Sequence, residues 1–190
     1  MAKGRRFLIA GNWKMNGLKK DGRALAKSVA KTLKKAKGKK QPFDLLVCPP
    51  YTLLPYVASE IKGSGVKLGA QDCHVAEKGA HTGDISPYML EDVGCKYVIV
   101  GHSERRTDHK ESDAVVKGKA EAVLDAGMIA IVCIGETQAQ REGGRATTVN
   151  RRQLKGSLPA GATAKNTVVG YEPVCGVRPG LTARPQQAHE

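Results

Sequence analysis

The chain has 190 residues, of which 41% are hydrophobic and 26% are charged. This length supports one buried core and is too short for two ordinary domains, so we expect a single domain over residues 1–190. No stretch approaches the roughly 18 to 20 apolar residues that span a bilayer, and the apolar run near the N-terminus is too short for a signal peptide. We therefore expect no membrane partner.

The cysteines indicate a reducing environment. Their number is odd, they lie far apart, and they form no CxxC pair: Cys48, Cys73, Cys95, Cys133 and Cys175. This pattern predicts neither a disulfide framework nor a zinc site, and it favours a cytoplasmic location.

The net charge of +13 comes from one end of the chain, since the first 40 residues hold 14 of the 31 basic residues and one of the 18 acidic residues. Apolar side chains recur there at helical spacing, at Leu18, Leu25, Val29, Leu33 and Ala36. We interpret this stretch as an amphipathic helix with a lysine-rich solvent face. Nucleic-acid binding is the alternative, which we do not favour because aromatic residues make up only 4% of the chain and none interleaves with the lysines.

Short apolar runs alternate with helix-compatible segments along the chain. In chain order, the pattern predicts strands at 7–10, 45–48, 66–70, 97–100, 129–134 and 168–171, and helices at 18–37, 52–62, 86–94, 112–126 and 138–156. The apolar runs are nearly continuous, as in parallel strands that are covered on both faces. The alternation predicts an α/β protein, either a doubly wound sheet or a barrel.

Polar side chains gather where the predicted strands end. They are Asn12, Lys14, Gln71, Asp72, His102, Glu104, Glu136 and Glu172. The carboxyl ends of parallel strands converge on one opening in βα folds, and binding and catalytic groups collect there. No glycine-rich dinucleotide or P-loop fingerprint follows any strand, so the sequence does not indicate a dinucleotide site or a P-loop.

Five segments resemble the triosephosphate isomerase family, in order and at family spacing. They are AGNWKMN at 10–16, GAQD at 69–72 with GAHTGDIS at 79–86, VGHSERR at 100–106, CIGET at 133–137 and GYEPV at 170–174. The resemblance implies a (β/α)8 TIM barrel, of which only about six of the eight βα units are present. It also implies an isomerase of glycolysis and gluconeogenesis that interconverts dihydroxyacetone phosphate and D-glyceraldehyde 3-phosphate through an enediolate.

The same resemblance assigns roles to individual residues. Glu172 is expected to be the base at carbon, and His102, as a neutral imidazole before a short helix, the electrophile at the carbonyl oxygen. Lys14 supplies a positive charge near the substrate, and Asn12 can hydrogen-bond the same oxygens. Glu104 is expected to organise the surroundings of His102 and Lys14. No metal or other cofactor is expected for this chemistry.

The loop around Thr82 resembles the family's interdigitating loop, which implies a homodimer. The remaining histidines His74, His109 and His189 show no constellation in the sequence. We expect Cys133 to be a small packing residue at a strand end.

Two departures from the family pattern leave an alternative open. In the lid after Glu172, Cys175 stands where the family usually has tryptophan, and Arg178 followed by Pro179 replaces a glycine. The seventh and eighth strands are also absent from these 190 residues. The alternative is an inactive TIM-barrel chain that serves as an interaction or assembly module.

Overall fold

The computed structural model describes residues 6–35 and 41–173. Six strands form one parallel sheet in the order in which they occur along the chain. They are β1 (Phe7–Asn12), β2 (Phe43–Cys48), β3 (Lys67–Ala70), β4 (Tyr97–Val100), β5 (Ile129–Ile134) and β6 (Thr167–Tyr171). Each strand overlaps the apolar run that predicts it, so the sequential parallel α/β arrangement is confirmed.

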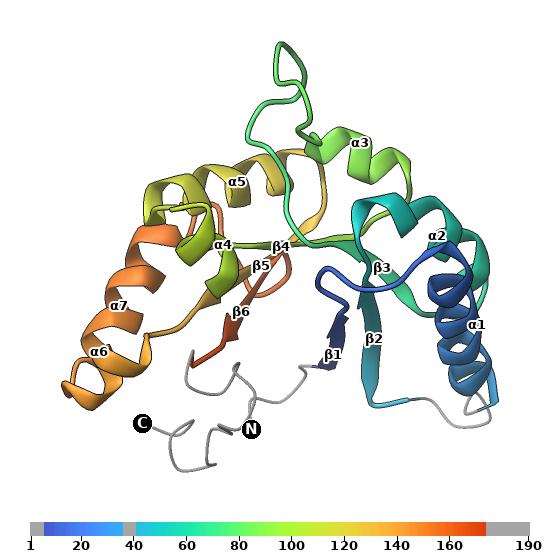
Figure 1. The fold of residues 1–190 in the computed structure, drawn as a ribbon, viewed down its shortest axis with the longest axis horizontal. Helices are drawn as coiled ribbons and strands as arrows, with labels where there is room; N and C mark the ends of the chain where they lie inside the picture. The colour runs from blue at the N-terminus through green and yellow to red at the C-terminus, as the bar shows by residue number, and fades with distance from the viewer. Residues whose placement is uncertain (1–5, 36–40, 174–190) are drawn as a thin grey trace.

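Helices connect the strands and lie in an arc around the sheet (Figure 1). They are α1 (Lys19–Lys35), the 3₁₀ turn η2 (Tyr51–Leu53), α2 (Leu54–Ile61), α3 (Pro87–Asp92), α4 (Ser103–Asp108), α5 (Asp113–Asp125), α6 (Gln138–Glu142) and α7 (Ala146–Ser157). No helix in the part of the chain that the structure describes is long and apolar enough to cross a membrane.

The two faces of the sheet bury separate sets of apolar side chains. One layer includes Val47, Val98 and Val100 and packs against the helices. The other includes Leu46, Cys48, Ile99, Ile131 and Cys133. Successive strand residues point to opposite faces of the sheet. The first set therefore lies on the outer face, under the helices, and the second set forms the inner layer of the curved sheet.

Two helix predictions differ from the structure. The single helix predicted at 138–156 is wrong, because the chain forms α6 and α7 with Gly143 and Gly144 between them. Gly144 adopts a positive φ of 68°, which lets the backbone leave the helical path. Thr137 and Gln140 form a capping box at the start of α6.

The buried side of α1 also differs from the prediction. Small residues, Gly22, Ala26 and Ala30, face the core. Leu18 and Leu25 are exposed by 77% and 50%. A side chain on Gly22 would lie 2.8 Å from Leu53, so the first part of α1 approaches the core too closely for a leucine to face inward. Val29 and Leu33 of the predicted stripe do pack against the core.

β1 and β6 lie at the two ends of the sheet, and each pairs with one neighbour among the described residues. On β1, Phe7 and Ile9 are exposed by 62% and 50%, and on β6 Val169 is exposed by 44%. The structure is therefore an open, curled segment of a barrel, with uncovered apolar positions at both of its edges.

Candidate active site

The carboxyl ends of the strands bring the predicted site residues together. Asn12 is the last residue of β1, His102 follows β4, and Glu172 follows β6. His102 Nε2 lies 3.1 Å from Glu172 Oε2, and Lys14 Nζ lies 2.8 Å from Glu104 Oε1. The sites on β1, β4 and β6 thus meet on one rim of the sheet, although the strands are far apart in the sequence.

His102 is fixed in one tautomer by the helix that it begins. It is the N-cap of α4, and its Nδ1 accepts a hydrogen bond from the Glu104 backbone N–H at 3.2 Å. Since Nδ1 is an acceptor, the proton of the neutral imidazole lies on Nε2. The ring is 4% exposed and directs its N–H donor toward the Glu172 carboxylate.

Glu172 directs one carboxylate oxygen toward His102. Its Oε2 is buried and has no hydrogen-bond partner among the described residues, although it lies at ion-pair distance from His102. The backbone N–H of Glu172 donates to the Ile134 carbonyl at 2.8 Å, which anchors the residue to the end of β5.

Lys14 occupies a strained backbone conformation. Its φ is +53°, in the left-handed region, which costs a residue with a Cβ roughly 1–2 kcal/mol. Two hydrogen bonds hold this conformation: Asn12 Oδ1 accepts the Lys14 N–H at 3.0 Å, and Gln71 Nε2 donates to the Lys14 carbonyl at 2.9 Å. Asn12 and Gln71 therefore position the lysine.

Glu104 lies between the lysine and the histidine. Its Oε1 contacts Lys14 Nζ at 2.8 Å, and its Oε2 lies 3.4 Å from His102 Nδ1. The side chain is half exposed, so the ion pair is partly screened by water. The carboxylate faces the imidazole edge away from Glu172.

A buried ionic cluster fixes α4 against its surroundings. Lys119 Nζ contacts both oxygens of Asp72 at 2.7 and 2.8 Å and Glu111 Oε1 at 2.6 Å. Arg105, on α4, contacts the same two carboxylates. Burial raises the pKa of Asp72, whereas the hydrogen bonds from Lys119 and Arg105 outweigh burial and lower the pKa of Glu111.

A second cluster holds the segment that leads to Glu172. Glu136 is fully buried and accepts hydrogen bonds from Arg141, Asn150 and Tyr171. Burial alone would raise the pKa of Glu136, but these donors reverse the shift and lower it. Because Tyr171 directly precedes Glu172, this cluster fixes the position of the chain just before the candidate base.

Two further sequence predictions concern Cys133 and the lid that follows Glu172. Cys133 is buried in the inner layer, and burial together with the nearby Glu172 raises its thiol pKa, as expected of a packing residue. The lid residues Cys175, Arg178 and Pro179 lie outside the described residues.

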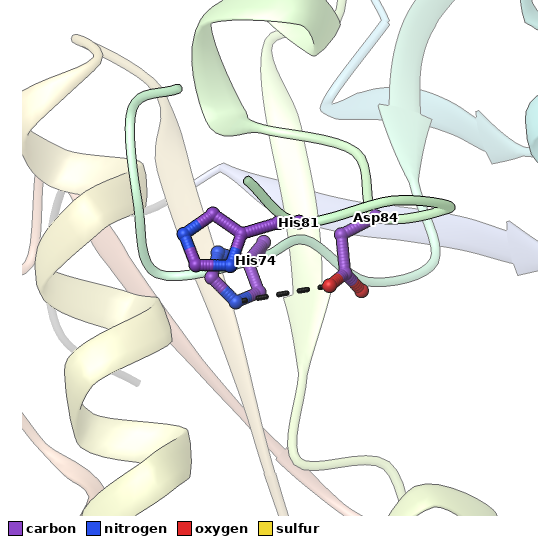
Figure 2. A group of neighbouring side chains, drawn as sticks. All are labelled: His74, His81 and Asp84. Atoms are coloured by element: carbon purple, nitrogen blue, oxygen red, sulfur yellow. Dashed lines mark ion pairs between the residues drawn. The ribbon is translucent and has the colours of Figure 1, made fainter. Parts of the chain in front are cut away.

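Sequence reasoning missed two features. The role of Gln71 in holding Lys14 was signalled only by its position after a strand. The prediction that His74 has no constellation is wrong, because the loop before α3 brings it beside His81 and Asp84 (Figure 2).

Comparison with known proteins decides the family. The Triosephosphate isomerase family profile matches residues 7–190. The chain belongs to the triosephosphate isomerase family. The triosephosphate isomerases of Afipia carboxidovorans and Bradyrhizobium diazoefficiens are 55% and 53% identical to it over 188 residues, which cover 97% of this chain and 72% of each relative.

A solved structure agrees with this assignment. The crystal structure of triosephosphate isomerase from Bartonella henselae superposes with a TM-score of 0.80 at 43% identity, covering 90% of this chain and 69% of that one. The partial (β/α)8 barrel and the isomerase function expected from the sequence are thus confirmed, and nothing in these comparisons favours the assembly-module alternative.

Proposed function

We propose that Glu172 and His102 carry out the interconversion of dihydroxyacetone phosphate and D-glyceraldehyde 3-phosphate in this triosephosphate isomerase. Glu172 removes a proton from the carbon beside the carbonyl, and His102 donates its Nε2–H to the carbonyl oxygen. The two reacting substrate atoms are bonded neighbours, so base and donor must lie side by side. The observation that supports the proposal is the distance of 3.1 Å between His102 Nε2 and Glu172 Oε2, a buried oxygen with no hydrogen-bond partner among the described residues.

Lys14 and Asn12 support the charge that develops on the enediolate. The Lys14 ammonium supplies a fixed positive charge near the substrate oxygens, and the Asn12 amide can donate to the same oxygens. Glu104 positions both partners, since it contacts Lys14 Nζ and its backbone N–H holds the His102 ring. Every step is a proton transfer between side chains and substrate, so the proposal includes no cofactor.

The test compares two proteins. One is residues 1–190, and the other, the completed protein, continues them with the C-terminal region of the Afipia carboxidovorans relative. Closing a barrel holds catalytic groups within about half an ångström of productive geometry. We expect the completed protein to isomerise glyceraldehyde 3-phosphate far faster than residues 1–190 alone. Equal rates in both proteins would contradict the requirement for closure.

Glu172→Gln in the completed protein tests the assigned base. It removes the basic oxygen and keeps the size of the side chain, so kcat/KM is expected to fall by at least about a thousandfold. The matched control is Glu142→Gln, at the exposed end of α6, which is expected to leave kcat/KM unchanged. Full activity in Glu172→Gln would remove Glu172 from the reaction.

The loop between β3 and α3 supports a homodimer. It projects from the body of the fold, and its residues 77–84 are exposed (Figure 1). Thr82 lies within this stretch, where the family resemblance places the docking loop. Sedimentation at micromolar concentration is expected to give a dimer that Thr82→Asp weakens; a wild-type monomer would contradict the proposal.

Cys48, Cys73, Cys95 and Cys133 are free thiols, which supports a cytoplasmic location.

A further inference from the structure

Helix α7 places a polar side chain in the middle of the face that it buries. The buried residues of α7 are Val149, Gln153 and Ser157, at every fourth position along the helix. Gln153 is only 7% exposed, and the isomerase chemistry described above gives it no role. We propose that Gln153 is a positioning residue of the isomerase, which holds the end of β5 and, through it, the base Glu172.

The side-chain amide of Gln153 forms two hydrogen bonds to one backbone residue. Its Oε1 accepts the Gly135 N–H at 2.8 Å, and its Nε2 donates to the Gly135 carbonyl at 3.1 Å. Gly135 directly follows β5, so its backbone groups lie where the sheet ends. The amide satisfies the N–H and the carbonyl of Gly135 in the way that a neighbouring strand satisfies a strand residue.

Gly135 lies against the backbone of Glu172. A Cβ at position 135 would meet the Glu172 carbonyl, and the carbonyl of Ile134 accepts the Glu172 N–H at 2.8 Å. A shift of Gly135 would therefore move the support on which Glu172 rests. Since Glu172 Oε2 lies 3.1 Å from His102 Nε2, the same shift would change the distance between the base and the hydrogen-bond donor.

A neighbour on the same helix holds the next residue of the chain. Asn150, which precedes Gln153 by about one turn of α7, donates to Glu136 Oε2 at 2.8 Å. Glu136 in turn accepts a hydrogen bond from the Tyr171 hydroxyl at 3.1 Å. Helix α7 thus binds the two residues that follow β5, and these contact the chain at Tyr171 and Glu172.

Gln153→Met in the completed protein tests the catalytic consequence. Methionine is an unbranched side chain of similar length that fills the buried space without either hydrogen bond. A displacement of about 1 Å at a catalytic group costs about a hundredfold in rate, so kcat is expected to fall by about that factor. KM is expected to change little, because the groups assigned to the substrate oxygens, Asn12 and Lys14, belong to the end of β1.

Gln153→Glu separates positioning from packing. A neutral carboxyl group can donate to the Gly135 carbonyl and accept the Gly135 N–H, whereas a carboxylate can only accept. Burial and the facing carbonyl favour the neutral form, so kcat relative to wild type is expected to rise at least about tenfold from about pH 8 to about pH 6. For Gln153→Met this ratio is expected to stay constant. Gln138→Glu, at an exposed position of α6, is the control and is expected to keep the wild-type kcat at both pH values.

Charged groups on the elements packed around this part of α7 are already paired. Glu136 is hydrogen-bonded as described, and Arg106 contacts Asp113 Oδ1 at 2.6 Å. Arg152, next to Gln153, lies 3.7 Å from Asp113 Oδ2. Carboxyl and guanidinium groups do not ordinarily titrate between about pH 6 and 8, and the titration of the catalytic pair cancels in the ratio to wild type. A recovery in this range therefore reports the introduced carboxyl group.

Amide hydrogen exchange provides a readout that needs no catalysis and uses residues 1–190. In Gln153→Met, the N–H groups of Gly135 and Glu172 are expected to exchange with D₂O at least about tenfold faster than in wild type. The reference is the Ala130 N–H at the other end of β5, which donates to the Asn166 carbonyl at 3.0 Å and is expected to keep its rate. A general loss of stability would accelerate all three amides equally, and that result would overturn the proposal.

Two kinetic results would also overturn it: wild-type kcat in Gln153→Met, or a loss in Gln153→Glu that does not change with pH. The catalytic part of the proposal rests on the proposed function, whereas the exchange rates do not. Full activity of Glu172→Gln would therefore overturn the proposed function, and the exchange of the Gly135 and Glu172 amides would still decide whether Gln153 holds this part of the chain.

Discussion

Gly135 and Glu172 meet through their backbones. The position that a Cβ on Gly135 would occupy falls on the Glu172 carbonyl oxygen, and the carbonyl carbon would lie 2.8 Å from it. The Glu172 N–H in turn donates to the carbonyl of Ile134. The absence of a side chain at position 135 therefore allows β6 to end close against β5 and deliver Glu172 to His102.

Gly135→Ala tests this relationship. The added methyl must push the Glu172 backbone away, and a displacement of about 1 Å at a catalytic group costs about a hundredfold in rate. We expect kcat/KM of the completed protein to fall by at least that factor. Gly161→Ala is the control, since a Cβ there meets nothing within 4 Å. Equal activity in both variants would show that Gly135 does not place Glu172.

Lys14→Met tests whether one positioned ammonium matters or the general positive charge. Removing a charge that stabilises the enediolate should cost several kcal/mol, which is about a thousandfold or more in kcat/KM. Charge reversal at Lys34 or Lys35, at the exposed end of α1, is expected to change kcat/KM little. Equal losses at all three positions would contradict the assigned role of Lys14.

Lys119→Met tests the buried ionic cluster. The substitution leaves Asp72 and Glu111 buried without their main cation, so the free energy of unfolding is expected to fall by about 3 kcal/mol or more. Lys117→Met, on the same helix, breaks an exposed pair with Glu121 at 3.9 Å and is expected to cost less than about 0.5 kcal/mol. Denaturant titration of both variants measures the difference, and similar losses would contradict the account.

The lowered pKa of Glu136 predicts that the free energy of unfolding depends on pH. Its pKa is lower in the folded protein, so its stabilising contribution is full above the ordinary carboxyl value of about 4.3 and is lost as pH falls below it. Glu111 acts in the same direction, whereas Asp72, with a raised pKa, acts oppositely. The loss of unfolding free energy between about pH 5 and 3 should be smaller in Glu136→Gln than in the wild type. Parallel pH profiles would contradict this role.

The sequence predicts the alternation of strands and helices because apolar runs and helical spacing are local signals. The positions of the site residues at strand ends follow from the same signals. The break between α6 and α7 depends on the positive φ of Gly144, which helical spacing does not record. The small-residue face of α1 depends on how closely the helix approaches Leu53. The spacing of apolar residues shows which face of a helix is apolar, but not how much space the neighbouring elements of the fold leave for side chains on that face.

The partners within the site depend on long-range contacts. Gln71 reaches Lys14 across 57 positions, and Lys119 reaches Asp72 across 47. Nothing local to Gln71 or Lys119 indicates these partners, because the fold creates them. The grouping of His74 with His81 and Asp84 depends on the turn geometry at Gly79 and Gly83, which spacing alone does not specify.

The most direct test of the account is isomerisation of glyceraldehyde 3-phosphate by the completed protein in D₂O, with the product analysed by mass spectrometry. If Glu172 removes a carbon proton and exchanges it with solvent, the dihydroxyacetone phosphate will contain solvent-derived deuterium on carbon. Glu172→Gln will form this product at least about a thousandfold more slowly. Product formed by Glu172→Gln at the wild-type rate would contradict the assignment of Glu172 as the base.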